Sequence, residues 1–245
     1  MIITAHGGAL NTGRNGVKFF ETIKNYPVDA VEVDVRQKGG ELYISHMPPL
    51  FLKKILPLSF VFEFIKENGF KVNCDMKRGG TAGAVFLAAQ KAGAQDRLIF
   101  TGRVERDDLE ELRGSAEFLR AKERGVSGRV ERGDLKELRG AAVYLDPKFF
   151  GFSIDGNLGR VKDEIEKLNC PFVKGININY RRCGESVLVE AEKYGVGLSV
   201  YTVDDAAELR RLTGRAAVEN ITTNIPDEAI KIYAEKGGTI PRKTR

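Results

Sequence analysis

The sequence predicts an α/β protein of the (β/α)8 TIM barrel class, with a duplicated turn–helix–strand unit inserted in the middle of the chain. Two observations predict this fold. Short segments rich in β-branched residues alternate with amphipathic stretches along the whole chain, and sustained alternation of this kind is typical of a parallel sheet. The length of 245 residues is also close to the roughly 250 residues of a typical barrel. We therefore expect residues 1–245 to form a single domain.

Nine segments have the composition of strands, and they are MIITAH, AVEVDV, KVNCDM, RLIFTG, AEFLRA, AAVYLD, FVKGININ, GLSVYTV and ENITTN. The segments between them include NGVKFFETIKNY, TAGAVFLAAQKAGAQ, RVKDEIEKLN and GESVLVEAEKYG, which have helical periodicity. In SFVFEFIKENG the phenylalanines alternate as in a strand, but the position of this segment between two strands favours a helix. ELYISH is expected to be a short additional strand.

An internal duplication explains why the count exceeds eight strands. GRVERDDLEELRGSA begins at Gly102 and GRVERGDLKELRGAA begins at Gly128, with 12 of 15 positions identical. Two copies are too few for a solenoid. Residues 102–142 are therefore expected to be a unit inserted on the outside of the barrel, or to include one copy that is a surface excursion. The basic turns could bind an acidic partner, but a solvated helix with paired charges is favoured.

The composition argues against several classes of protein. No apolar run reaches the ~20 residues of a membrane-spanning helix, so no transmembrane segment is expected. Three cysteines without metal-ligand spacing favour the reducing cytoplasm. The formal charge of +5 weakly favours an anionic ligand, but the basic tail at 236–245 is the only basic block, so no nucleic-acid partner is predicted. The oligomeric state is left open.

Two acids lie close together in the segment AVEVDV. Side chains two residues apart on a strand point to the same face, so Glu32 and Asp34 are expected to project together. Like charges held inside a fold are costly unless a cation or protons neutralise them. Hard oxygen ligands at this spacing suit Mg²⁺ or Ca²⁺. The alternative is a solvated strand end that carries ordinary surface charge.

Other reactive side chains fall at the ends of neighbouring strands. His6 and His46, the two histidines of the chain, follow strand segments, and Asp75 and Lys77 follow KVNC. In a parallel barrel the carboxyl ends of the strands meet at one mouth, where such enzymes carry their catalytic residues. Each histidine alone would be interpreted as structural, but two of them beside three carboxylates favour catalysis.

These residues also carry a resemblance to a known family. AHGG, EVDV, YISHM, NCDMK, YTVDD and TTNIP resemble, in order and over nearly the whole chain, the motifs of the glycerophosphodiester phosphodiesterases of the phospholipase-C-like superfamily. The resemblance implies hydrolysis of a glycerophosphodiester to an alcohol and glycerol 3-phosphate. It implies His6 and His46 as the acid–base pair and Lys77 near the phosphate. It also implies a divalent cation (Mg²⁺ or Ca²⁺, or else Mn²⁺) held by Glu32, Asp34 and Asp75.

The sequence departs from the family pattern at several positions. Gly7 stands where the family has an arginine, and Arg14 stands where a glutamate usually joins the site. We expect Arg14, Asn15 and Tyr201 to contact the substrate, with Arg14 replacing the missing guanidinium. A solvated role for Arg14 and a core role for Tyr201 are the alternatives. The family's aspartates after the second histidine and near the end of the chain are Met47 and Asn224 here.

Other functions remain open at this stage. Sphingomyelinase D enzymes also lack the arginine, so a lysophospholipid or sphingolipid diester is an alternative substrate, with PPLFLKKILPLSFVF as an apolar lip that contacts lipid. A loop and helix packed over the barrel is the other interpretation of that segment. A catalytically silent barrel that binds a phosphorylated ligand is a further alternative. A sugar-phosphate isomerase or aldolase is least favoured, because no glycine-rich phosphate motif occurs late in the chain.

Overall fold

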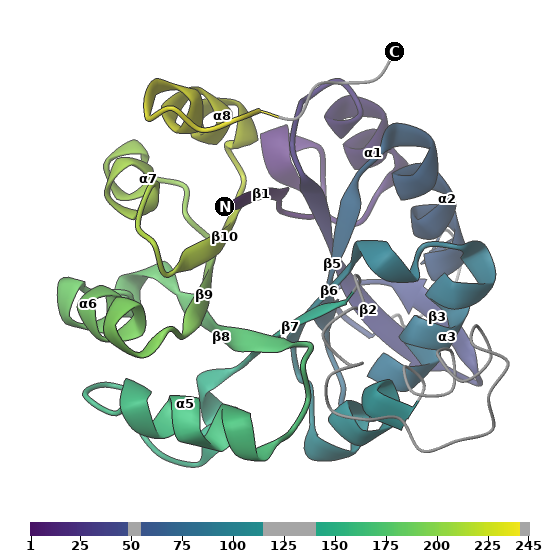
Figure 1. Cartoon of the computed structure of the whole chain (residues 1–245). Coiled ribbons are helices and arrows are strands. Elements are labelled where there is room, and N and C mark those ends of the chain that lie inside the picture. Colours follow the sequence, from purple (N-terminus) through teal and green to yellow (C-terminus); the bar gives the residue numbers. More distant parts are fainter. Residues whose placement is uncertain (49–54, 115–140, 241–245) are drawn as a thin grey trace, which may run out of the picture.

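The computed structural model describes residues 1–48, 55–114 and 141–240. Eight parallel strands form a closed ring, in which β10 pairs with β1 and β1 pairs with β2 (Figure 1). Around the ring the strands are β1 (Ile2–Ala5), β2 (Ala30–Lys38), β5 (Lys71–Met76), β6 (Leu98–Gly102), β7 (Ala142–Leu145), β8 (Val173–Asn179), β9 (Gly197–Tyr201) and β10 (Val218–Thr223). The predicted (β/α)8 barrel is therefore confirmed.

Helices surround the ring of strands (Figure 1). They are α1 (Val17–Ile23), α2 (Leu58–Asn68), α3 (Ala82–Ala92), α5 (Leu158–Lys167), α6 (Glu185–Tyr194), α7 (Ala206–Leu212) and α8 (Pro226–Glu235), and residues 106–114 are also helical. Local sequence sets several ends. The Asp205 side chain accepts hydrogen bonds from the first amides of α7, and Gly69 ends α2 in the left-handed conformation. The segment of alternating phenylalanines is thus a helix, as its position indicated.

The alternation within β2 separates the core from the site. Val31, Val33 and Val35 are fully buried in the main hydrophobic core, which also contains residues of α1, α2 and α3. Successive side chains of a strand point to opposite faces, so Glu32 and Asp34 point to the inside of the barrel. The valines of β2 therefore pack in the core with the helices, and the two acids lie inside the barrel.

Several side chains in the barrel interior are polar. Thr4 Oγ1 donates to Asn220 Oδ1 at 2.6 Å, and Asn220 Nδ2 donates in turn to Ser199 Oγ at 2.9 Å. All three side chains are buried. Buried polar groups cost little only when they are hydrogen-bonded, and this chain of bonds satisfies them. The same polar character continues to the carboxyl ends of the strands.

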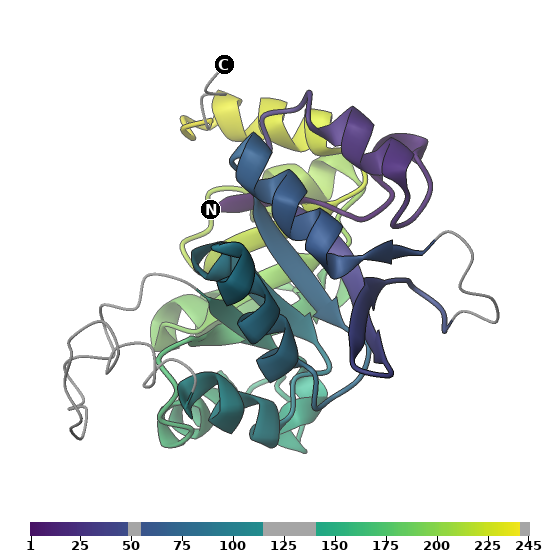
Figure 2. The ribbon, with the colours of Figure 1, turned by 90° about the vertical axis from the view of Figure 1, so that its right-hand side faces the viewer.

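Two short antiparallel strands extend the sheet beside β2. These are β3 (Glu41–Ile44) and β4 (Leu56–Pro57), and they extend beyond the ring of helices in Figure 2. The short strand predicted in ELYISH is therefore present, and His46 lies two residues beyond its end. No helix in the described parts of the chain is long and apolar enough to cross a membrane.

Some predicted features lie outside the described residues. The strand segment AEFLRA and most of the duplicated unit at 102–142 fall within 115–140. Residues 49–54 of the proposed apolar lip and residues 241–245 of the basic tail are also outside. The other eight strand segments are the eight strands of the barrel.

Candidate active site

A cavity of about 580 Å³ lies at the carboxyl ends of the barrel strands. It is lined by six of the side chains that the sequence predicted for the site, namely His6, Glu32, His46, Asp75, Lys77 and Tyr201. The topology brings these residues together from five different strands or the loops after them, although they are up to 195 positions apart in the sequence. The mouth of the barrel therefore contains the predicted cluster.

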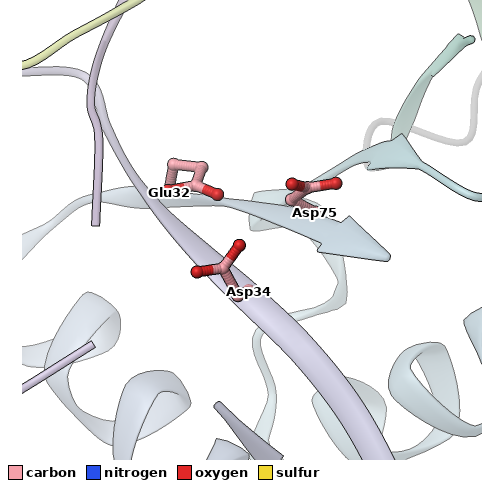
Figure 3. A group of neighbouring side chains, drawn as sticks. All are labelled: Glu32, Asp34 and Asp75. Atoms are coloured by element: carbon pink, nitrogen blue, oxygen red, sulfur yellow. The ribbon is translucent and has the colours of Figure 1, made fainter. Parts of the chain in front are cut away.

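Three carboxylates converge at this mouth (Figure 3). Glu32, Asp34 and Asp75 each offer an oxygen atom, and these atoms lie within 4.8 Å of one another. Asp34 and Asp75 are direct register partners in the β2–β5 pair, and Glu32 and Asp34 are 4% and 3% exposed. An all-oxygen set of this size fits a hard cation such as Mg²⁺ or Ca²⁺. Burial, together with the nearby charges of Asp34 and Asp75, raises the pKa of Glu32.

Lys77 lies between two of these acids. Its Nζ is 2.5 Å from Asp34 Oδ1 and also donates to Asp75. Burial opposes the charge of Lys77, but the carboxylates of Asp75 and Asp34 outweigh it and raise the lysine pKa. The same balance holds at Asp34, where burial is outweighed mainly by Lys77 and the pKa is lowered. Lys77 is therefore a positive charge held between Asp34 and Asp75.

The loop after β1 packs tightly against the acids. The Gly7 amide donates to Glu32 Oε2 at 2.8 Å, and Asn15 Nδ2 donates to Asp34 Oδ2 at 2.7 Å. The Asp34 amide returns a bond to Asn15 Oδ1 at 3.2 Å. A Cβ atom on Gly7 would lie 2.8 Å from the carbonyl oxygen of Glu32. This loop therefore has no room for the family's arginine at position 7, and Asn15 holds Asp34 from the same loop.

The protonation of His6 is set by a chain of hydrogen bonds. Asn224 Nδ2 donates to Asp204 Oδ2 at 2.7 Å, which orients the amide so that its Oδ1 faces His6 Nδ1 at 2.8 Å. Because an amide oxygen only accepts, Nδ1 carries the proton and Nε2 keeps its lone pair. Nε2 is 3.9 Å from Glu32 Oε2. Burial lowers the pKa of His6, which favours this neutral form.

His46 contacts the acidic cluster at Asp34. Its Nδ1 is 3.3 Å from Asp34 Oδ1, and its side chain is 45% exposed. A carboxylate accepts and does not donate, so Nδ1 of His46 carries a proton toward Asp34. The two imidazoles thus contact different acids of the same cluster and differ in their surroundings.

The remaining predicted residues have different positions. Arg14 is exposed, packs beside Gly8 and does not line the cavity. Tyr201 lines the cavity and is half-buried, and burial together with Asp146 and Asp75 raises its pKa. Two arginines that sequence reasoning did not assign, Arg36 and Arg103, line the cavity instead. Strand alternation would have predicted Arg36 for the site, because it is two residues after Asp34 and therefore on the same face of β2.

Comparisons with known proteins show the fold. No protein-family model and no curated protein matches the sequence. A glycerophosphodiester phosphodiesterase from Parabacteroides distasonis is similar with a TM-score of 0.67 at 15% identity, covering 96% of this chain and 98% of that chain. One from Agrobacterium tumefaciens has a TM-score of 0.64 at 14% identity, covering 96% and 99%.

A third similar structure contains a reaction product. The phosphodiesterase from Oleispira antarctica, in complex with the product sn-glycerol-3-phosphate, has a TM-score of 0.66 at 15% identity, covering 96% of this chain and 97% of that chain. A barrel of another activity, the phosphoribosylanthranilate isomerase from Pyrococcus furiosus, has a TM-score of 0.54 at 12% identity, covering 96% and 99%. The resemblance to the phosphodiesterases is thus confirmed at the level of the fold.

Proposed function

We propose that this protein hydrolyses a glycerophosphodiester to an alcohol and glycerol 3-phosphate, with a divalent cation and two histidines. One observation carries the proposal. Two imidazoles, each in contact with a different acid of a buried carboxylate cluster, line one cavity at the carboxyl ends of a barrel. Two glycerophosphodiester phosphodiesterases have similar folds. A third similar structure is a phosphodiesterase in complex with the product sn-glycerol-3-phosphate.

The two histidines are suited to opposite proton transfers. His6 has a free Nε2 and takes the proton from the attacking hydroxyl as its oxygen bonds to phosphorus. His46, whose Nδ1 lies 3.3 Å from Asp34 Oδ1, gives a proton to the alcohol oxygen as its bond to phosphorus breaks. When the neighbouring glycerol hydroxyl attacks, the alcohol leaves with the proton from His46 and a cyclic phosphate forms. One water then bonds to phosphorus as a ring oxygen–phosphorus bond breaks, and its hydrogens end on the freed glycerol hydroxyl and on the phosphate, which gives glycerol 3-phosphate.

Glu32, Asp34 and Asp75 are proposed to hold the cation. When bound, a divalent cation supplies positive charge to the phosphoryl oxygens and so stabilises the transition state. Lys77 adds a further positive charge beside Asp75 and Asp34. Asn15 and Gly7 orient two of the acids through the bonds described above.

The test is a panel of cations and substrates. Bis(p-nitrophenyl) phosphate, glycerophosphocholine, glycerophosphoglycerol and a lysophospholipid are incubated separately with the protein. Release of p-nitrophenol is measured for the first, release of glycerol 3-phosphate for the two glycerophosphodiesters, and release of the headgroup alcohol for the lysophospholipid. EDTA is expected to abolish turnover, and Mg²⁺, Mn²⁺ or Ca²⁺ to restore it. Unchanged turnover in chelator would reject the cation assignment, and preferred cleavage of the lysophospholipid would favour the alternative substrate class.

A second candidate function rests on Lys77. Because this lysine bonds to both Asp34 and Asp75, it neutralises part of the cluster without a metal. A barrel neutralised in this way could bind a phosphorylated ligand without cleaving it. Binding of sn-glycerol 3-phosphate together with no turnover under any cation would establish this function instead.

The cellular location is also proposed. Cys74, Cys170 and Cys183 are all buried and free, which is in keeping with a reducing compartment. Burial raises the pKa of the Cys183 thiol to about 11, so this thiol is unreactive at neutral pH. We therefore place the protein in the cytoplasm.

A further inference from the structure

In the part of the chain that the structure describes, one lysine and two arginines line the cavity, and their contacts differ. Lys77 is bonded to Asp34 and Asp75. Arg36 donates through Nε to the carbonyl oxygen of Ser45 at 3.0 Å and through an Nη to that of His46 at 2.7 Å. Arg36 therefore holds the segment that carries His46, and Lys77 holds the acids. Neither has its full set of donors available for a ligand.

Arg103 is the exception. Its side chain is exposed and lines the cavity. Among the residues that the structure describes, no hydrogen bond, ion pair or aromatic ring engages its guanidinium. All five N–H donors of this group are available, in the planar arrangement that matches two oxygens of a phosphate.

The backbone places Arg103 beside the carboxylate cluster. Thr101 is the register partner of Asp75, and Gly102 follows it in the left-handed conformation. A Cβ atom on Gly102 would lie 2.0 Å from Asp75 Oδ1, so the chain passes directly against this carboxylate. The Arg103 amide then donates to the carbonyl oxygen of Met76 at 2.7 Å, which fixes the start of the side chain at the mouth.

We propose that Arg103 binds the non-bridging oxygens of the substrate phosphate, and so provides the guanidinium that position 7 cannot hold. The ligand class is a phosphate group, either of the diester or of the glycerol 3-phosphate product. Arg103 belongs to the first GRVER turn of the duplicated unit, so this copy contributes a residue to the site. The identity of the diester rests on the proposed function. The binding of a phosphate group by Arg103 can be tested without turnover.

The first test measures binding without catalysis. The full-length protein is treated with EDTA and titrated with sn-glycerol 3-phosphate by calorimetry, with glycerol as the uncharged control. Arg103→Ala is expected to weaken glycerol 3-phosphate binding about 10-fold to 100-fold, the range for a hydrogen-bonded charged group, and Arg103→Lys should recover part of it. Arg106→Ala is the matched control, because Arg106 lies in the same turn but its guanidinium stacks 5.2 Å from the centre of the Phe149 ring.

The second test measures turnover. Arg103→Ala is expected to raise KM for a glycerophosphodiester and lower kcat/KM at least 10-fold, while Arg106→Ala leaves both unchanged. Equal binding and equal kcat/KM in the Arg103→Ala and wild-type proteins would overturn the inference even if wild type is active. A wild type that binds glycerol 3-phosphate through Arg103 and turns over nothing would support the inference and reject the proposed hydrolase.

Discussion

The α-carbon of Gly102 abuts the carboxylate of Asp75, so closely that a Cβ atom at position 102 would lie 2.0 Å from Asp75 Oδ1. Gly102 also has a positive φ of 74°, which disfavours any residue with a side chain. The absence of a side chain at the end of β6 is therefore what leaves room for the third acid of the cluster.

Gly102→Ala is expected to displace Asp75 and weaken cation binding about 10-fold or more, because one of three charged ligands would be misplaced. Titration with Mn²⁺, followed by electron paramagnetic resonance, measures this affinity. Gly80→Ala is the matched control, since Gly80 has a φ of 71° but nothing within 4 Å of an added Cβ. It shares the backbone strain of about 1 kcal/mol and should bind Mn²⁺ normally. Similar affinities in the two variants would show that Gly102 does not shape the cation site.

His6→Ala and His46→Ala are each expected to lower kcat at least ~10²-fold, because each removes one of the two proton transfers. Steady-state hydrolysis of bis(p-nitrophenyl) phosphate measures the effect, and circular dichroism checks folding. Met47→Ala is the control for His46, since Met47 lines the same cavity and is 67% exposed. A correctly folded histidine variant with near-native kcat would make that histidine structural.

Much of this site follows from strand alternation alone. The period of two in AVEVDV predicted that Glu32 and Asp34 project to the same face, and parallel topology predicted that they meet Asp75 at one mouth. The same rule extends to Arg36, which was missed because the strand was expected to end after AVEVDV, whereas β2 continues to Lys38.

Other parts of the site depend on backbone geometry that no sequence period encodes. In the loop after β1, Leu10, Asn11 and Asn15 all have positive φ angles. The resulting path buries Asn15 against Asp34 and leaves Arg14 exposed. Arg103 follows a left-handed glycine, so its direction at the mouth did not follow from the alternation of β6.

Long-range partners were equally inaccessible to sequence reasoning. The pair of Asp204 and Asn224 joins the loops after β9 and β10, and it orients His6 on a third strand end. Asn224 was noted only as a departure from the family pattern. Its partnership with Asp204 depends on the closure of the barrel between β9, β10 and β1.

Asn224→Leu is expected to lower kcat about 10-fold to 100-fold with little change in KM, the usual range for a group that orients a site residue. The substitution removes the acceptor that fixes the Nδ1–H tautomer of His6. Asn224→Asp should retain more activity, because a carboxylate still accepts this proton. The ¹⁵N chemical shifts of the His6 ring provide an independent readout of the tautomer. Native kcat and native shifts in Asn224→Leu would remove Asn224 from the catalytic arrangement.

Glu32 is a residue at which function and stability are expected to conflict. Its side chain is buried beside Asp34 and Asp75, and burial, followed by the charges of these two acids, raises the Glu32 pKa. Glutamine is nearly the same size, carries no charge and still offers an oxygen to the Gly7 amide, which donates to Glu32 in the wild type. Glu32→Gln is therefore expected to raise the Tm of the metal-free protein, because it removes one buried charge from the cluster.

The cation should reverse this order of stability. A ligand at 100 times its Kd stabilises the folded state by about 2.7 kcal/mol, so Mg²⁺ or Ca²⁺ is expected to raise the Tm of wild type. Glu32→Gln should gain much less, because a charged ligand is missing. Thermal unfolding with EDTA and with each cation measures both effects, and Glu63→Gln, on the exposed face of α2, is the control. If Glu32→Gln is less stable than wild type in EDTA, repulsion among the three acids does not destabilise the metal-free protein. If Glu32→Gln gains as much Tm from the cation as wild type does, Glu32 is not a ligand of the cation.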